Sequence, residues 1–313
     1  MVPAAESEGA IPACQAVSVS NPFLVTGPAV ISFSGGRTSG YMLWRVLQAH
    51  GGTLPEGVIV CFANTGREMP ATLRFVQDCG EHWGVSIHWL EYRRDAETGR
   101  VFAEEVGPNS ASRDGEPFAA MLQGKGFMPS PVQRFCTTEL KVRTIRRWCV
   151  QNYGKAITWT QVVGLRADEP RRVERIMDPA RQKKAGKESR NVVVPLAVAG
   201  ITKDDVLAFW QQQPFDLGLR GSWEGNCDGC FLKRRSFITR LWQDAPERAA
   251  WWAQQEALAA LKTSGRGNRF RKDWKGGYDG IRRAAAASPR LPMLDPDDDA
   301  ADVFAACDTG CGA

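Results

Sequence analysis

The chain has 313 residues, a formal net charge of +5, and 43% hydrophobic residues. Its length predicts one sizeable domain with an appended subdomain, or two small domains, and its apolar content allows a substantial core. The mild positive charge permits an anionic ligand such as a nucleotide. No apolar run reaches the ~20 residues of a membrane helix, and residues 1–16 lack the basic and apolar regions of a signal peptide. We therefore expect a cytoplasmic protein with no membrane partner.

Apolar runs and amphipathic stretches alternate along the first two hundred residues. Strands are expected at 30–33, 57–62, 85–90 and 157–163, and helices at 41–49, 71–83 and 138–151. Strand, loop and helix repeating in this order predict an α/β fold with a Rossmann-like parallel sheet flanked by helices. Two other stretches, 93–134 with many Gly, Pro and Ser residues and the basic stretch 178–190, are expected to be irregular or mobile loops.

Composition divides the chain into four expected parts. These are a flexible leader (1–27), a nucleotide-binding α/β domain (28–200), a helical, cysteine-bearing C-terminal subdomain (201–264), and a basic segment with an acidic, disordered tail (265–313). Within the third part, Thr202 is a suitable N-cap for a helix over 203–212.

A glycine-rich loop, Ser34-Gly35-Gly36-Arg37-Thr38-Ser39, follows the first expected strand. Its glycines let the backbone turn sharply and approach an anion without an obstructing Cβ. The N–H groups at the start of the next helix would point at that anion, and the helix dipole would favour its charge. A plain strand-to-helix turn is the alternative, but the flanking hydroxyls favour a phosphate site.

The loop resembles the pyrophosphate loop of the ATP pyrophosphatases, and later stretches resemble the PAPS reductase/DndC-like family of this adenine nucleotide alpha-hydrolase superfamily (PAPS is 3′-phosphoadenosine 5′-phosphosulfate). Thr38 stands where ATP-using members usually carry Asp. The similar stretches follow in the family's order and are Phe62-Ala63-Asn64-Thr65-Gly66, an Arg-x-Cys segment ending at Lys141, a Gly-x-Arg-x-x-Glu motif from Gly164, and Pro195-Leu196. The resemblance extends from about residue 30 to about residue 235 and implies the adenine nucleotide alpha-hydrolase type of fold.

The resemblance also implies the ligands and the residues that hold them. The nucleotide would be ATP, PAPS or adenosine 5′-phosphosulfate (APS), with Mg²⁺ as an optional companion. Lys141, Arg166 and Glu169 are the implied catalytic residues, because cations and guanidinium forks suit a phosphate or sulfate ester. The implied nucleotide-binding residues are Ser32, Ser34, Gly35, Gly36, Arg37, Thr38, Ser39, Asn64, Thr65, Gly66, Gly164, Arg166, Arg171 and Arg172. Arg146 and Arg147 are expected to be a solvated helix face.

Cys227-Asp228-Gly229-Cys230 places two thiols at a chelating spacing. In the resembling enzymes, a cysteine at the position of Cys136 joins such a pair around a four-iron four-sulfur cluster, and Phe135 replaces a further ligand there. The set could be completed by Cys149 or by a tail cysteine, Cys307 or Cys311, or one iron could stay open. A structural zinc site and a redox disulfide are alternatives.

Two other groups of cysteines have simpler interpretations. Cys61 and Cys79 occur in apolar patterns and are expected to be buried core thiols. Cys311 shares only a Cys-Gly pair with the nucleophilic tail of the thioredoxin-dependent reductases, so a tail residue without a catalytic role is favoured.

Three functions remain open. The first is ATP-activated sulfur transfer to a nucleic acid or small acceptor, with a sulfur-donor protein as partner. The second is reduction of PAPS or APS to sulfite with a thiol reductant protein, and the third is an inactive nucleotide- or nucleic-acid-binding accessory protein of a phage or defence system. The basic stretch 262–283, with Phe270, Trp274 and Tyr278 interleaved, could contact nucleic acid or be a solvated linker.

Overall fold

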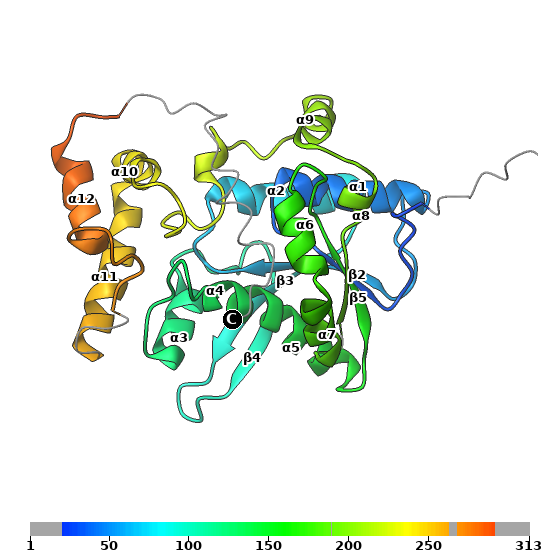
Figure 1. Cartoon of the computed structure of the whole chain (residues 1–313), viewed down its shortest axis with the longest axis horizontal. Helices are drawn as coiled ribbons and strands as arrows, with labels where there is room; N and C mark the ends of the chain where they lie inside the picture. Colours follow the sequence, from blue (N-terminus) through cyan, green and yellow to red (C-terminus); the bar gives the residue numbers. More distant parts are fainter. Residues whose placement is uncertain (1–20, 189, 263–267, 292–313) are drawn as a thin grey trace, which may run out of the picture.

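Short apolar runs pair into a six-stranded sheet in the order β4-β3-β2-β1-β5-β6, with helices on both faces (Figure 1). The computed structural model describes residues 21–188, 190–262 and 268–291. All strand pairs are parallel except β3–β4, which is antiparallel. The strands are β1 (Ala29–Ser32), β2 (Val58–Asn64), β3 (Ile87–Arg94), β4 (Val101–Val106), β5 (Trp159–Val163) and β6 (Arg190–Val193). The predicted α/β class with a sheet flanked by helices is confirmed.

Helices follow most strands and continue as a group at the carboxyl end of the described chain. They are α1 (Arg37–Ala49), α2 (Pro70–Trp83), α3 (Glu116–Lys125), α4 (Phe135–Thr137), α5 (Arg143–Tyr153), α6 (Pro170–Met177), α7 (Pro179–Lys187), α8 (Pro195–Val198), α9 (Lys203–Gln211), α10 (Arg235–Asp244), α11 (Pro246–Lys262) and α12 (Gly277–Ala287). A π-helical turn, η1 (Thr138–Val142), joins α4 to α5, and η2 (Ser222–Glu224) is a 3-10 turn. None of these helices is long and apolar enough to cross a membrane.

The strands contribute apolar side chains to a cluster on each face of the sheet, because successive side chains of a strand point to opposite faces. Ile31 and Phe62 pack in one cluster with α1, α2 and α9. Val30 and Cys61, their neighbours in sequence, pack in another cluster with α5. Cys61 and Cys79 are fully buried, as predicted. The predicted N-cap is also confirmed, since Thr202 forms a capping box with Asp205 at the start of α9.

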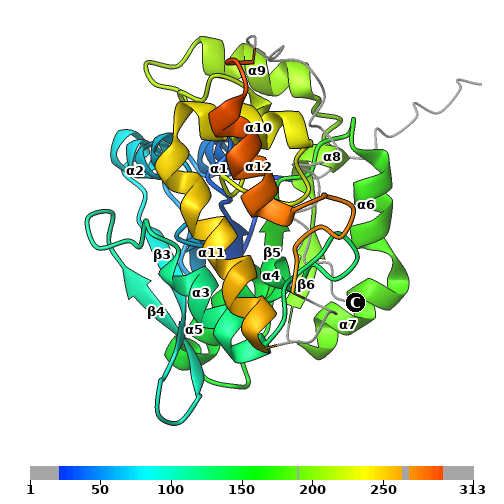
Figure 2. The same cartoon turned by 90° about the vertical axis from the view of Figure 1, so that its left-hand side faces the viewer.

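A third apolar cluster joins α10, α11 and α12 to α3 and η1. Figure 2 shows α11 and α12 side by side in front of α3 and α4. Phe270, Trp274 and Tyr278 belong to this cluster, and Phe270 and Tyr278 are 0% exposed. These three rings are therefore packed in the core, where a base could not reach them, and contact of the cationic residues of the stretch with nucleic acid stays a prediction.

Four other expectations need correction. Residues 93–134 contain β4 and α3, and the stretch 178–190 contains α7 and the start of β6, so neither is an irregular loop. The described part of the expected leader, 21–27, contributes Phe23 and Val25 to the core. Helix α12 makes residues 277–287 part of the helical subdomain, while the acidic stretch 292–313 lies outside the described residues.

Replacing Phe270 by Ala tests whether this ring is core or ligand platform. We expect the variant to lose about 3–5 kcal/mol of unfolding free energy, because the substitution leaves a cavity among Trp252, Phe231 and Tyr278. Urea denaturation measures the loss. Leu261→Ala, at a side chain that is 84% exposed, is the control and should change stability by less than about 0.5 kcal/mol. Unchanged stability in Phe270→Ala would contradict the core assignment.

Candidate functional site

The glycine-rich loop lies at the carboxyl end of β1, which is bordered by β2 on one side and by β5 on the other. In open α/β sheets, ligands bind in the crevice at such a switch point. Gly35 adopts φ +78°, and a Cβ there would lie 2.7 Å from Cγ2 of Thr72. Both the backbone conformation and the packing therefore require glycine. Gly36 is the N-cap of α1 and offers no side-chain cap, so the first N–H groups of α1 remain available to an anion.

Hydrogen bonds of two serine hydroxyls stabilise the conformation of the loop. The Ser39 hydroxyl donates to the Gly36 carbonyl at 2.9 Å and lies 2.9 Å from the Ser34 hydroxyl. The Ser34 amide donates to the same Ser39 oxygen at 3.2 Å. The Arg37 side chain forms a bidentate ion pair with Asp216, at 2.7 and 2.5 Å. Arg37 therefore faces Asp216 with its guanidinium and contributes its backbone to the helix start.

Arg166 brings the Gly-x-Arg-x-x-Glu motif to this loop. Its Nη1 donates to the Thr38 hydroxyl at 3.1 Å, across 128 residues of sequence. Asp168 accepts from its Nε at 2.8 Å, and Glu169 accepts from its backbone N–H at 3.0 Å. Glu169 also pairs with Arg172. Glu169 thus holds two arginines in place, while Arg171 is exposed to solvent.

A small pocket of about 40 Å³ lies against the loop. Five predicted residues line it, namely Ser32, Ser34, Ser39, Lys141 and Gly164. Gly164 contacts the start of α1 closely, since a Cβ there would lie 3.2 Å from the Ser39 Cα. Lys141 comes from the π-helical turn η1, a form that is frequent at functional sites. The structure therefore brings Ser34 and Ser39 of the predicted loop together with Lys141 around one anion-sized space, which we name the phosphate-loop pocket. Arg166 contacts the same loop at Thr38 but does not line this pocket.

The second-strand motif lies near this pocket but has its polar atoms occupied. Asn64 is fully buried and donates to Glu91 at 2.6 Å and to the Ser112 carbonyl at 2.9 Å. Thr65 donates to Glu68 at 2.8 Å, and the Gly66 amide donates to Asn64. These contacts fix the turn after β2, so the nucleotide contacts expected of Asn64, Thr65 and Gly66 stay a prediction.

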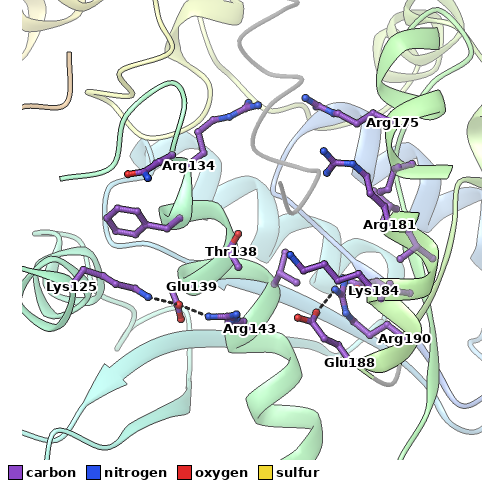
Figure 3. A pocket seen from close by; sticks show the side chains of 18 of the residues that line it. Lys125, Arg134, Thr138, Glu139, Arg143, Arg175, Arg181, Lys184, Glu188 and Arg190 are labelled. Atoms are coloured by element: carbon purple, nitrogen blue, oxygen red, sulfur yellow. Dashed lines mark hydrogen bonds and ion pairs between the residues drawn. The ribbon is translucent and has the colours of Figure 1, made fainter. Parts of the chain in front are cut away.

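A larger cavity of about 310 Å³ adjoins the phosphate-loop pocket, and the two share Val142, Gln161 and Val163 as lining residues. We name it the basic cavity. Figure 3 shows its cations on opposite walls, with Lys125, Arg134 and Arg143 on one side and α6, α7 and β6 on the other. Its seven cationic lining residues are Lys125, Arg134, Arg143, Arg175, Arg181, Lys184 and Arg190, and Glu139 and Glu188 are its carboxylates.

Glu139 organises one wall of the basic cavity. Its carboxylate accepts from Lys125 at 2.8 Å, Arg143 at 2.7 Å and Arg147 at 2.9 Å. Burial alone would raise its pKa, but the hydrogen bonds to Arg147 and Lys125 and the charge of Arg143 lower the pKa of Glu139 to about 2. The expectation that Arg147 belongs to a solvated face is therefore wrong, and Arg146 donates to the Glu188 carbonyl.

The Cys-Asp-Gly-Cys turn is fixed by its aspartate. Asp228 is 0% exposed and accepts from Arg67 at 2.5 and 3.2 Å, from Arg248 at 2.5 Å and from the Trp252 indole at 2.7 Å. Gly229 has no room for a side chain, because a Cβ would lie 2.4 Å from Trp252. The turn is thereby attached both to the loop after β2 and to α11, and the Cys227 Sγ lies 3.3 Å from the Thr65 hydroxyl.

The three predicted ligand thiols share one region but do not form a metal site as placed. Cys227 and Cys230 are buried in the third apolar cluster, and Cys136 packs against it. Within residues 21–188, 190–262 and 268–291, no three His, Cys, Asp or Glu side chains are grouped as metal ligands. The ligand set stays a prediction, and no step below is assigned to a cluster.

The remaining thiols separate into other regions. Cys149 lies with Cys61 in the cluster beside α5, whereas Cys227 and Cys230 lie in the third apolar cluster, so Cys149 is not grouped with them. Burial raises the pKa of the Cys149 thiol to about 12. The alternative of a redox disulfide between Cys227 and Cys230 stays a prediction. Cys307 and Cys311 lie outside the described residues.

Lys233 is a feature that the sequence did not single out. It is 2% exposed, its Nζ has no hydrogen-bond partner, and it lies in the electrostatic environment of Cys230, Asp228 and Cys227. Burial lowers the pKa of the Lys233 ammonium, while these neighbours oppose the shift. The only sequence signal that could have singled out Lys233 is its position shortly after the cysteine pair.

No protein-family model matches the chain. It is 31% identical over 208 residues to the uncharacterized nin region protein ORF290 of Escherichia phage lambda, which covers 65% of this chain and 66% of that protein, just under two thirds of its length. It is 26% identical over 274 residues to an uncharacterized 37.8 kDa protein of Escherichia phage 186, covering 76% and 77%. Among solved structures, it is similar to the U34-tRNA thiolase NcsA from Methanococcus maripaludis with its [4Fe-4S] cluster. That match has 14% identity and a TM-score of 0.37, and it covers 91% of this chain and 81% of the thiolase.

Replacing Glu139 by Gln should reduce the loss of unfolding free energy that occurs as the pH is lowered. Because the folded pKa is about 2 and the ordinary value is 4.5, the carboxylate stabilises the fold fully above about pH 4.5 and loses this contribution as the pH falls toward 2. Urea denaturation between pH 5 and pH 3 should show a steeper loss in the wild type, by at most about 1.4 kcal/mol per pH unit. Glu247→Gln, at an exposed position, should follow the wild type. Parallel profiles for wild type and Glu139→Gln would contradict the ion-pair assignment.

Replacing Asp228 by Ala should destabilise the protein by about 3–5 kcal/mol, because two arginines would lose their buried counterion. Asp273→Ala removes a carboxylate that is 59% exposed from its pair with Arg271 and should cost less than about 1 kcal/mol. The two variants are compared by urea denaturation, and equal effects would show that Asp228 is not a structural anchor.

Proposed function

We propose that the chain is an enzyme that binds an adenine nucleotide with its phosphates at the phosphate-loop pocket and uses it to activate an acceptor for sulfur transfer. The observation that carries the proposal is the 3.1 Å contact between Arg166 and Thr38, which places a guanidinium beside the free N-terminus of α1. Such a terminus and a guanidinium fork both favour phosphate. The resemblance of five ordered motifs to the PAPS reductase/DndC-like family supports adenine as the base.

The proposed first step is adenylation. An acceptor oxygen attacks the α-phosphorus of ATP, the bond between the α- and β-phosphates breaks, and pyrophosphate leaves with the bonding electron pair. The α1 amides, Ser34 and Arg166 stabilise the charge that develops on pyrophosphate. Such stabilisation by preorganised donors is usually the largest single contribution to catalysis. Lys141, which lines the pocket, supplies a further positive charge at the reacting phosphates. Glu169 acts through Arg166, whose orientation it fixes.

The proposed second step transfers sulfur. A hydrosulfide ion supplied by a donor protein attacks the activated carbon or phosphorus of the acceptor. The new bond to sulfur forms as the bond to the AMP oxygen breaks, and AMP leaves with the electron pair. The rigid Cys227–Cys230 turn lies beside Thr65 at the carboxyl end of β2 and therefore close to the edge of the sheet where the phosphate loop begins. We propose this thiol pair as the place where the incoming sulfur is received.

Replacing Arg166 by Ala should lower the rate of pyrophosphate release from ATP about 10²-fold or more, because it removes a donor to the departing charge. Arg166→Lys should recover only part of the rate, since an ammonium keeps the charge but loses the fork. Arg74→Ala, an exposed position on α2, is the control and should react like the wild type. Pyrophosphate is measured with and without a mixture of nucleic acids and small acceptors.

The same assay separates the three candidate functions. Release of pyrophosphate from ATP that depends on Arg166 supports the proposal. Sulfite and adenosine 3′,5′-bisphosphate from PAPS would instead establish the reductase, and nucleotide binding without turnover would establish an accessory binding protein. Iron content and visible absorption of anaerobically purified protein test the predicted thiol ligands Cys136, Cys227 and Cys230 separately.

A further inference from the structure

The charged side chains that line the basic cavity have no role in the proposed binding of nucleotide phosphates at the phosphate-loop pocket. Seven cations and two carboxylates line it, and five of the seven cations are arginines. A surplus of guanidinium groups on facing walls is suited to phosphate groups, which accept from the planar forks of arginine bidentately. The cavity therefore selects a ligand with phosphate charge.

Two aromatic rings give the cavity a second specificity. Phe127 and Phe135 both line it, and their ring centroids are 4.9 Å apart at an interplanar angle of 68°. Phe127 is 38% exposed, although a phenylalanine normally prefers the interior. Lys125 lies 5.8 Å from the Phe135 centroid. Phe127 is exposed and Phe135 is partly buried. An accessible ring among cations is an arrangement on which a single-stranded base stacks, while the cations follow the backbone.

The volume of the basic cavity and its connection to the phosphate-loop pocket restrict the kind of ligand further. The volume of about 310 Å³ is at the lower end for small-molecule sites, which suits one nucleotide unit and excludes a stacked duplex. Gln161 connects the two spaces, since it donates to the Ser32 hydroxyl at 2.9 Å and accepts from Arg190 at 2.8 Å. A nucleotide unit in the basic cavity would thus lie next to the phosphates of the bound adenine nucleotide.

We propose that the basic cavity binds one nucleotide of a single-stranded nucleic acid, with its base against Phe127 and Phe135 and its phosphates on the arginines and lysines of α6 and α7. This inference deepens the proposed function, on which it rests for the identification of the strand as the sulfur acceptor. The binding site itself is defined by the cavity and not by the 262–283 stretch, whose rings Phe270, Trp274 and Tyr278 are buried.

The test is fluorescence anisotropy with labelled twelve-nucleotide single strands of DNA and of RNA, in the absence of ATP. Arg181→Ala/Lys184→Ala should weaken binding at least tenfold and reduce the slope of log affinity against log salt by about 1.4, the value for two lost phosphate contacts. Phe127→Ala should weaken binding about tenfold through lost stacking. Lys183→Ala, the neighbouring exposed lysine of α7 that does not line the cavity, is the matched control and should stay within twofold.

Three results would overturn the inference. One is equal binding by wild type and the Arg181→Ala/Lys184→Ala variant. The second is a preference for duplex over both single strands, or for free AMP over the oligonucleotides. The third is loss of binding on Arg282→Ala/Arg283→Ala, which removes the same charge from the exposed side of α12. Binding of either DNA or RNA through the cavity supports the inference.

Failure of the inference and failure of the proposed function give different results. Oligonucleotide binding that depends on the cavity, without pyrophosphate release from ATP, would refute the enzyme proposal and leave the nucleic-acid site intact. Pyrophosphate release that depends on Arg166, with oligonucleotide affinity insensitive to all the cavity variants, would refute the nucleic-acid site alone.

Discussion

The site depends on one constraint, the position of β1 between β2 and β5. The chain leaves β1 toward β2 on one side and returns to β5 on the other, so no helix connection covers the crevice at its carboxyl end. Gly35 turns the backbone there at φ +78°, under Thr72 and Phe62, and delivers the start of α1 to the crevice. The loop after β5 then brings Arg166 onto Thr38. A different residue at Gly35 would move α1, and the phosphate-loop pocket with it.

A buried carboxylate, that of Asp228, fixes the position of the Cys227–Cys230 turn. Asp228 joins Arg67, at the end of β2, to Arg248 on α11, so the helical subdomain and the sheet hold the two thiols between them. A buried ion pair is a weak source of stability when compared with apolar packing, but its removal is costly and its geometry is specific. Asp228 therefore fixes the shape of the turn.

Local patterns predicted the parts of the molecule whose structure is determined locally. Apolar strands, the glycine loop and the Thr202 cap are each encoded within a few residues, and all are present. Helix α7 was missed because its polar, lysine-rich sequence lacks an apolar stripe, although lysine, arginine and glutamine are good helix formers. The aromatic residues at 270, 274 and 278 were misread because their burial is decided by α10 and α11. Likewise, nothing local indicates that Arg134 and Arg181 face one cavity.

The two spaces at the sheet edge differ in a way that suits two different substrates. The phosphate-loop pocket is small, and its polar lining consists of the hydroxyls of Ser32, Ser34 and Ser39 with Lys141 and Gln161, beside apolar side chains from β2, η1 and β5. The basic cavity is built from long cationic side chains on α6 and α7, which can adapt to a flexible strand. Gln161 contacts both, and its two hydrogen bonds make the position of Arg190 dependent on that of Ser32. One side chain thus links the polar lining of the two spaces.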